Sequence, residues 1–194
     1  MDLKLYLREK AALVDEALDR FLPAADILPG ALHQAMRYSV MAGGKRIRPV
    51  LMLAACAAAG GDEKRALPAA CAMEMIHTYS LVHDDLPAMD DDDFRRGRPT
   101  NHKVYGEATA ILAGDALLTE AFRLLSDPEV NGDVPADVSL RIIHTFARCA
   151  GSRGMVGGQQ VDMEAEGADE IDFPTLEYIH THKTGALILA AVQS

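Results

Sequence analysis

The chain has 194 residues, of which 49% are hydrophobic and 25% charged, so it can enclose one substantial core or an internal cavity. Its formal net charge of −10 repels polyanions in general, which argues against nucleic acid or an anionic membrane surface as a partner. Leu, Ala and Met are common, Trp is absent and β-branched runs are few, a composition that favours helices over sheets.

The start of the chain predicts a cytoplasmic protein. Residues 1–10 alternate charged residues with leucine and lack the apolar stretch of a signal peptide. The longest apolar run, residues 50–59, is too short to span a bilayer, so we expect no membrane insertion. The three cysteines, Cys56, Cys71 and Cys149, have no C-x-x-C spacing, and we expect them to be reduced core residues.

Apolar residues recur at helical spacing through most of the chain, and Gly and Pro separate the segments. This pattern predicts one all-α domain over residues 1–194. The last segment is strongly apolar and stops at Ser194, so we expect its packing partners, the C-terminal helices, to be missing and the domain to be incomplete. In chain order, the helices are predicted at residues 2–21, 31–42, 49–59, 63–86, 107–126, 136–150, 154–166, 174–183 and from 185 onward.

A glycine turn at residues 43–49 (GGKRIRP) brings three cations to the start of a predicted helix. Backbone amides, a helix N-terminus and basic side chains together form a good cradle for phosphate. The turn is not a P-loop, because it lacks the Gly-x-x-x-x-Gly-Lys-Ser/Thr arrangement and a preceding strand. Taken alone, it could equally be a solvated basic turn.

Residues 81–102 contain six aspartates followed by three arginines. Carboxylate oxygens suit Mg²⁺, which keeps several waters and shares its remaining positions between one or two carboxylates and substrate phosphates. Arginines can then clamp phosphate oxygens. The alternative is a solvated acidic loop, but Asp84 and Asp85 end an apolar helical run, where a purely solvating acid pair would be out of place.

The spacing of Asp84 and Asp90 requires a break in the helix if both are to hold one metal. In a straight helix they would lie about 240° apart. Pro87 disfavours a helical conformation at Leu86, so the chain can bulge and bring Asp90 back toward Asp84. An EF-hand calcium loop that starts at Asp84 or Asp90 is excluded, because its sixth position requires glycine and is occupied by Met89 or Arg95.

Three weaker signals point toward the same interior. His77 precedes Asp84 by about two turns on one helix face, where it could donate to a second phosphate or be an ordinary core histidine. Gln159 and Asp162 lie one turn apart on a polar face. Residues 183–185 (KTG) indicate either a local break that exposes a cation and carbonyls, or an ordinary helix end.

In their order and spacing, these motifs resemble the trans-isoprenyl (polyprenyl) diphosphate synthases, most closely the bacterial farnesyl diphosphate synthases. The resemblance covers nearly the whole chain and rests on residues 43–49, 74–77, 84–96, 158–162 and 183–184. It implies the isoprenoid synthase fold, a bundle of antiparallel helices around a central substrate cavity. It also implies a cytoplasmic, homodimeric, Mg²⁺-dependent prenyltransferase that joins dimethylallyl or geranyl diphosphate to isopentenyl diphosphate, giving farnesyl diphosphate and pyrophosphate.

The resemblance also implies roles for individual residues. Asp84 and Asp90 would ligate Mg²⁺ with Asp85 assisting, and Arg95 would hold the allylic diphosphate. Lys183 and Thr184 match positions near the allylic head and the developing cation. Gln159 and Asp162 would line the cavity around it. The positions that match the isopentenyl diphosphate site are Gly44, Lys45, Arg48, His77 and Arg96.

The length of the product is expected to depend on the helix before Asp84. Tyr79 lies about 7.5 Å along the axis from Asp84, where its ring could form the floor of the cavity for the growing tail. A straight helix, however, turns Tyr79 about 140° away from Asp84, whereas the small Ser80 lies only about 40° away. A geranylgeranyl diphosphate synthase is therefore the alternative.

Two further alternatives are a class I terpene cyclase and a non-catalytic, synthase-like regulatory subunit. A cyclase has no second diphosphate to hold and little need for the basic turn. The family's second aspartate-rich motif would lie beyond Ser194, so we expect the 194-residue chain alone to be inactive, which favours the regulatory subunit. The intact Asp84, Asp90 and Arg95 argue against it.

Overall fold

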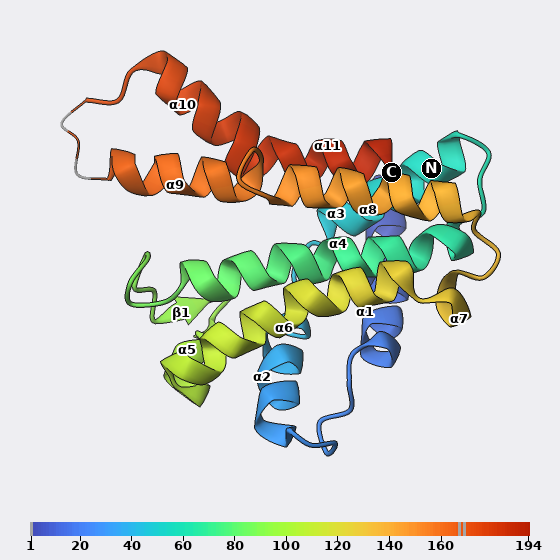
Figure 1. Cartoon of the computed structure of the whole chain (residues 1–194), viewed down its shortest axis with the longest axis horizontal. Coiled ribbons are helices and arrows are strands. Elements are labelled where there is room, and N and C mark those ends of the chain that lie inside the picture. Colours follow the sequence, from blue (N-terminus) through green and yellow to red (C-terminus); the bar gives the residue numbers. More distant parts are fainter. Residues whose placement is uncertain (1, 167, 169) are drawn as a thin grey trace.

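The computed structural model describes residues 2–166, 168 and 170–194, and it confirms the all-α prediction (Figure 1). Every predicted helix is present with ends within a few residues of those expected. The helices are α1 (Leu3–Phe21), α2 (Gly30–Val40), α3 (Ile47–Ala58), α4 (Glu63–Asp84), α5 (Asn101–Tyr105), α6 (Glu107–Ser126), α7 (Pro128–Asn131), α8 (Ala136–Ala150), α9 (Met155–Ala165), α10 (Phe173–Ile179), the π-helix η1 (His180–Gly185) and α11 (Ala186–Gln193).

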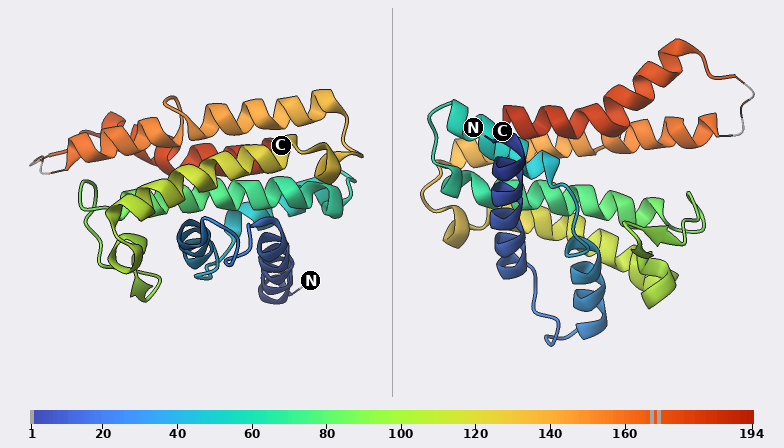
Figure 2. Two further views of the ribbon diagram at one scale, coloured as in Figure 1. Left: turned by 60° about the horizontal axis from the view of Figure 1, so that its bottom comes forward. Right: turned by 180° about the vertical axis from the view of Figure 1, so that it is seen from behind.

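Helix α4 is the central element of the fold. It runs antiparallel to α6, while α8 packs against α6 and α4 and is continued by α9, and α10 to α11 return in the opposite direction (Figure 1). Helices α1 and α2 cross this direction and cover a further face (Figure 2). Small and apolar side chains surround α4 on all sides, so most of its residues are buried, and the polar end at Asp84 is carried to the edge of the core.

One continuous core joins these helices. Its largest fully buried side chains come from α1, α3, α4, α6, α8 and α11: Leu18, Leu53, Met73, Met75, Ile76, Leu117, Leu124, Phe146 and Leu187. Cys71 and Cys149 are buried and free as expected, whereas Cys56 is partly exposed. Within the part of the chain that the structure describes, no helix combines the length and apolar character needed to cross a bilayer.

A short β-hairpin after α4 was not predicted. Strand β1 (Phe94–Arg95) pairs antiparallel with β2 (Arg98–Pro99), with Arg95 opposite Arg98. The two connecting residues, Arg96 and Gly97, have φ values of 53° and 75°, as the tight two-residue hairpin turn demands. This left-handed backbone conformation is unusual for arginine, and it fixes the direction in which the Arg96 side chain leaves the turn.

The expected break at residues 183–185 is present as the π-helix η1, which separates α10 from α11. Such single π-turns inside helices are frequent at functional sites. Gly158 of α9 lies against this turn, and a Cβ at that position would stand 2.1 Å from the backbone nitrogen of Lys183. The glycine therefore permits a backbone contact that brings Lys183 close to α9.

Candidate functional site

The chain folds back after α4 and brings Asp90 to Asp84. The backbone amide of Asp90 donates to the carbonyl oxygen of Asp84 at 2.9 Å, and Pro87 lies in the turn between them. The carboxylates are close enough to interact: reduced solvent contact and, next, the charge of Asp84 raise the pKa of Asp90. The structure thus has the bulge that the spacing required.

Asp84 lies at the junction of three elements. Asp84 Oδ1 accepts a hydrogen bond from Nε2 of Gln159 in α9. Asp84 Oδ2 lies 3.6 Å from Nζ of Lys183 in η1. Lys183 also donates to Asp162 of α9 at 2.6 Å. The structure therefore brings together four predicted residues that are distant in sequence, whereas Thr184 is exposed on the same π-turn.

The fit of Mg²⁺ to this region depends on the number of carboxylates. Among the described residues, no group of three or more His, Cys, Asp or Glu side chains gathers as a metal site. Asp84 and Asp90 together offer two oxygen-donor side chains, which is the set that Mg²⁺ uses when substrate phosphates and water complete its shell. The donor chemistry fits this ion.

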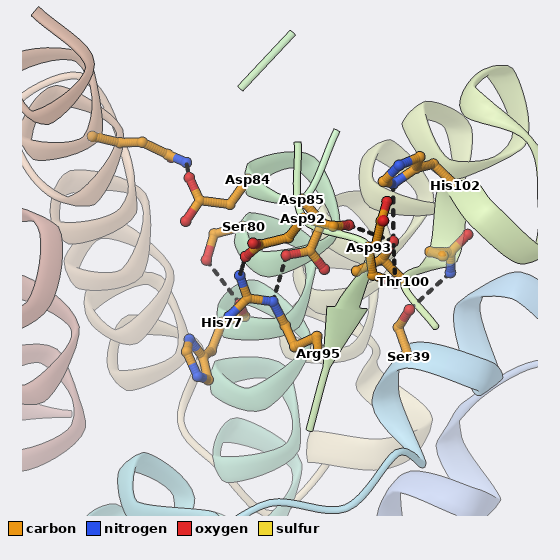
Figure 3. Close-up of polar contacts among 12 residues, drawn as sticks. Ser39, His77, Ser80, Asp84, Asp85, Asp92, Asp93, Arg95, Thr100 and His102 are labelled. Atoms are coloured by element: carbon orange, nitrogen blue, oxygen red, sulfur yellow. Dashed lines mark hydrogen bonds and ion pairs between the residues drawn. The ribbon is translucent and has the colours of Figure 1, made fainter. Parts of the chain in front are cut away.

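Asp85 points elsewhere. Its Oδ1 accepts from Arg95 Nε, and a second Arg95 nitrogen lies 3.2 Å from Asp92 Oδ2 (Figure 3). Burial raises the pKa of Asp85, and the guanidinium of Arg95 opposes that shift. Asp85 therefore orients Arg95 at the edge of the acidic site and does not join Asp84 and Asp90.

A second, basic pocket lies beside this site. Its cavity of about 470 Å³ is lined by all five residues expected to hold isopentenyl diphosphate, together with Arg46, Ile47 and Glu74. The pocket is made where the glycine turn before α3 meets α4 and the hairpin. Segments separated by about 30 and 50 residues therefore supply its cations, as the family resemblance implied.

The groups in the basic pocket repel one another. Burial, followed by the nearby guanidinium groups of Arg48 and Arg96, lowers the pKa of His77 to about 3. Arg48 Nη1 lies 3.3 Å from His77 Nε2. Because a guanidinium can only donate, Nε2 accepts and the neutral ring carries its proton on Nδ1. An anion in this pocket would relieve the repulsion.

Arg46 corrects the view that all three cations of the turn face a ligand. It is buried, at 3% exposure, and has a left-handed backbone with φ 48°. Its guanidinium contacts Asp15 at 2.8 Å, Glu74 at 2.6 Å and the carbonyl oxygen of Val40 at 2.6 Å. Arg46 thus ties the glycine turn to α1, α2 and α4, and each of its three guanidinium nitrogens already has a partner within the protein.

Gly44 makes room for Arg96. Its φ is 133°, and a Cβ there would stand 2.7 Å from the central carbon of the Arg96 guanidinium. Arg96 in turn donates to the carbonyl oxygen of Gly43. The glycine is therefore needed both for the backbone conformation and for the approach of the hairpin to the basic turn.

Tyr79 and Ser80 lie on different sides of α4. The Tyr79 ring packs edge-on against His83 with 5.8 Å between ring centroids, and His83 reaches the carbonyl oxygen of Ile111 in α6. His77, Ser80 and Asp84 instead follow one side of the helix (Figure 3). The structure does not bring the Tyr79 ring together with Asp84, and it places the smaller Ser80 on the Asp84 side of the helix.

Sequence reasoning missed the partners of two site residues. Glu74, which pairs with Arg46, was noted only as part of a motif, although an acid inside a buried apolar helix was a usable signal. Asp92, which contacts Arg95 three residues later, was hidden among identical neighbours. Neither contact could be assigned without the fold, because several aspartates and arginines satisfied the same spacing.

Comparisons with known proteins agree with this geometry. The family model described as "Polyprenyl synthetase" matches residues 29–194. A geranylgeranyl diphosphate synthase of Cyanophora paradoxa is 51% identical over 193 residues, which cover 100% of this chain and 63% of that protein. A farnesyl diphosphate synthase of Geobacillus stearothermophilus is 51% identical over 194 residues, covering 100% of the chain and 64% of the relative.

Solved structures give the same result. The apo crystal structure of an FPP/GFPP synthase from Zymomonas mobilis matches with a TM-score of 0.91 and 42% identity, covering 98% of this chain and 68% of that one. A geranyltransferase from Legionella pneumophila matches with a TM-score of 0.92 and 36% identity, covering 98% and 66%. The chain spans between half and two thirds of the length of the curated relatives it matches.

Proposed function

The chain belongs to the polyprenyl synthetase family, and from that premise we propose that its protein is a trans-prenyltransferase joining an allylic diphosphate to isopentenyl diphosphate. The observation that carries the proposal is the pairing of two unlike charged sites across one hairpin. Arg95 lies at the acidic site and Arg96 at the basic pocket, so two diphosphates would be held with their tails directed into the same helical bundle.

The basic pocket would hold isopentenyl diphosphate. Lys45, Arg48 and Arg96 supply cations, and His77 supplies a ring that can gain a proton when a polyanion removes the repulsion around it. Holding the alkene beside the allylic carbon makes a bimolecular reaction effectively unimolecular, which lowers its entropic barrier.

The acidic site would hold the allylic diphosphate. Asp84 and Asp90 are the residues that would bind Mg²⁺, which when bound neutralises charge on phosphate oxygens. Arg95 and Lys183 are placed to contact the departing pyrophosphate. As the allylic carbon–oxygen bond breaks, its electron pair leaves with pyrophosphate, the alkene of isopentenyl diphosphate forms the new carbon–carbon bond, and a proton is lost to the released pyrophosphate.

We propose farnesyl diphosphate as the product, from dimethylallyl or geranyl diphosphate. The relatives named above include both farnesyl and geranylgeranyl synthases. Geranylgeranyl diphosphate is the second candidate, because the small Ser80 lies on the Asp84 side of α4, whereas the Tyr79 ring packs against His83. Chromatography of the products decides between them: Tyr79→Ala should lengthen the chain if its ring is the stop, and Ser80→Phe should shorten it if the tail passes Ser80.

We also propose that the protein works in the cytoplasm as a homodimer. Ile111 and Leu112 on α6, which are 44% and 55% exposed, support a contact with a second copy. Sedimentation of the full-length protein tests the dimer, since Leu112→Asp should shift it to monomer.

The test of activity is incorporation of radiolabelled isopentenyl diphosphate by the full-length protein with geranyl diphosphate and Mg²⁺. Asp84→Asn should lower the rate at least a hundredfold, the scale seen when one charge-stabilising group is removed from an active site. Asp137→Asn, the same change on an exposed carboxylate of α8, is the control. Equal rates for Asp84→Asn and Asp137→Asn would overturn the assignment of the acidic site.

A further inference from the structure

The return strand of the hairpin is fixed to α2 by polar contacts that the reaction itself does not use. Asn101 is 2% exposed, and its Nδ2 donates to the carbonyl oxygen of Ala35 and to Ser39 Oγ, both at 2.8 Å. The hydroxyl of Tyr38 donates to the carbonyl oxygen of Pro99 at 2.8 Å. These contacts, made by Tyr38, Ser39 and Asn101, are called the α2 clamp below.

The same segment closes the acidic loop. Thr100 Oγ1 donates to the carbonyl oxygen of Asp92 at 2.8 Å, and the Thr100 amide donates to that of Asp93 at 3.0 Å (Figure 3). The Arg98 guanidinium lies 4.6 Å from the centroid of the Tyr38 ring. Both ends of the hairpin are therefore joined to each other and to α2, so the hairpin has a fixed base.

The hairpin carries two adjacent arginines that point to different sites. Arg95 reaches Asp85 and Asp92 at the acidic site, while the left-handed turn directs Arg96 to Gly43 and the basic pocket. A displacement of the base would therefore move both guanidinium groups together. Shifts of about 1 Å in groups that hold reactants can cost up to a hundredfold in rate.

We propose that Asn101 and Tyr38 are positioning residues that set both diphosphate sites at once through Arg95 and Arg96. The proposal rests on the proposed function, which makes these arginines the ligand contacts. It adds that α2, none of whose residues lines the basic pocket or belongs to the acidic site, determines where both of them lie. The consequence is that a single substitution in the α2 clamp should weaken the binding of two chemically distinct substrates together.

The first measurement is the affinity of the full-length protein for isopentenyl diphosphate and, separately, for geranyl diphosphate, by calorimetry. Asn101→Ala should weaken both about tenfold, and Tyr38→Phe, which removes one hydroxyl, about threefold. Asn131→Ala is the matched control, because the side-chain nitrogen of Asn131 likewise donates two hydrogen bonds, in its case to carbonyl oxygens of α6 and the α6–α7 connection, far from the hairpin. It should leave both affinities unchanged.

A double-mutant cycle separates positioning from a general loss of structure. In an Arg96→Ala background, Asn101→Ala should no longer weaken the binding of isopentenyl diphosphate. In an Arg95→Ala background, it should no longer weaken the binding of geranyl diphosphate. Full additivity in both backgrounds overturns the proposal. If Asn101→Ala does not fold, Tyr38→Phe carries the same cycle, and unchanged affinities for that variant overturn the proposal. Normal binding by Arg95→Ala and Arg96→Ala would instead overturn the proposed function.

Discussion

The basic pocket, which Arg96 of the hairpin lines, and the acidic site, where Arg95 pairs with Asp85, differ in how their charges are compensated. In the basic pocket the carboxylate of Glu74 is already paired with Arg46, so Lys45, Arg48 and Arg96 face a shared cavity. The acidic site is compensated internally, since Asp84 contacts Lys183 and Asp85 contacts Arg95. If the proposed function holds, the basic pocket is organised for an anion in advance, whereas the acidic site has to exchange its internal partners for its ligands.

The largest expected effect tests the division of labour within the basic turn. Arg46→Ala leaves Glu74, at 2% exposure, without its partner, and should lower the free energy of unfolding by about 3–5 kcal/mol. Lys45 is one residue earlier and exposed, so Lys45→Ala should change the free energy of unfolding by less than about 0.5 kcal/mol. It should nevertheless weaken the binding of isopentenyl diphosphate. Denaturant titration measures both, and equal destabilisation would remove the distinction between a structural and a ligand-facing cation.

The second effect concerns the contact that holds Lys183 in the acidic site. Gly158→Ala would place a Cβ 2.1 Å from the Lys183 backbone nitrogen, which no side-chain movement can relieve, so stability should fall by about 1–3 kcal/mol. Gly185→Ala is the control, because its Cβ would meet the nearest atom at 3.4 Å. That variant should be neutral or slightly stabilising. Thermal unfolding of both tests the pair, and a tolerant Gly158→Ala would show that α9 and η1 can separate.

The third effect is a pH dependence that belongs to the basic pocket. The folded-state pKa of His77, about 3, lies below its unfolded value of about 6.5, so the unfolded chain binds the extra proton first. Stability is therefore complete above about pH 6.5 and falls as the pH is lowered toward 3. Between pH 7 and 5 the loss should reach at most about 2 kcal/mol.

Denaturant titrations of the wild type and His77→Gln across this range isolate the contribution. The free energy of unfolding of the variant should fall less on acidification than that of the wild type. Above pH 6.5 the two free energies should change with pH at the same rate. Identical slopes at all pH values would show that the ring is not held in its neutral form by burial and the surrounding cations.

The smallest effect asks whether Lys183 competes with metal at the acidic site. Lys183→Met removes the cation 3.6 Å from Asp84, so Mg²⁺ should bind about tenfold more tightly even as turnover falls. Arg123→Met, which removes a cation paired with Glu120 and Asp127 on α6, is the control and should leave metal affinity unchanged. Calorimetric titration with Mg²⁺ measures both, and weaker binding by Lys183→Met would contradict internal compensation.

Much of the fold was predictable because its signals are local. Apolar spacing and the Gly and Pro positions placed all the main helices, and the KTG segment indicated the break that is observed as η1. The short α5 and α7 and the hairpin were missed. The hairpin depends on a left-handed Arg96, a conformation that arginine does not signal, and on anchoring by α2, which is 60 residues away in sequence.

By itself, the sequence determined which residues gather: an aspartate pair brought together by Pro87, a cationic turn, and a polar face on α9. Only the tertiary structure decided what each of them contacts. Arg46 and Arg48 look alike in the sequence, yet the buried Arg46 pairs with Glu74 and with the partly exposed Asp15, while Arg48 contacts His77 in the basic pocket. Likewise, Asp84 turns to Lys183 and its neighbour Asp85 to Arg95. The physical reason is that spacing along a chain fixes the direction of a side chain, whereas the partner it meets depends on distant elements packed against it.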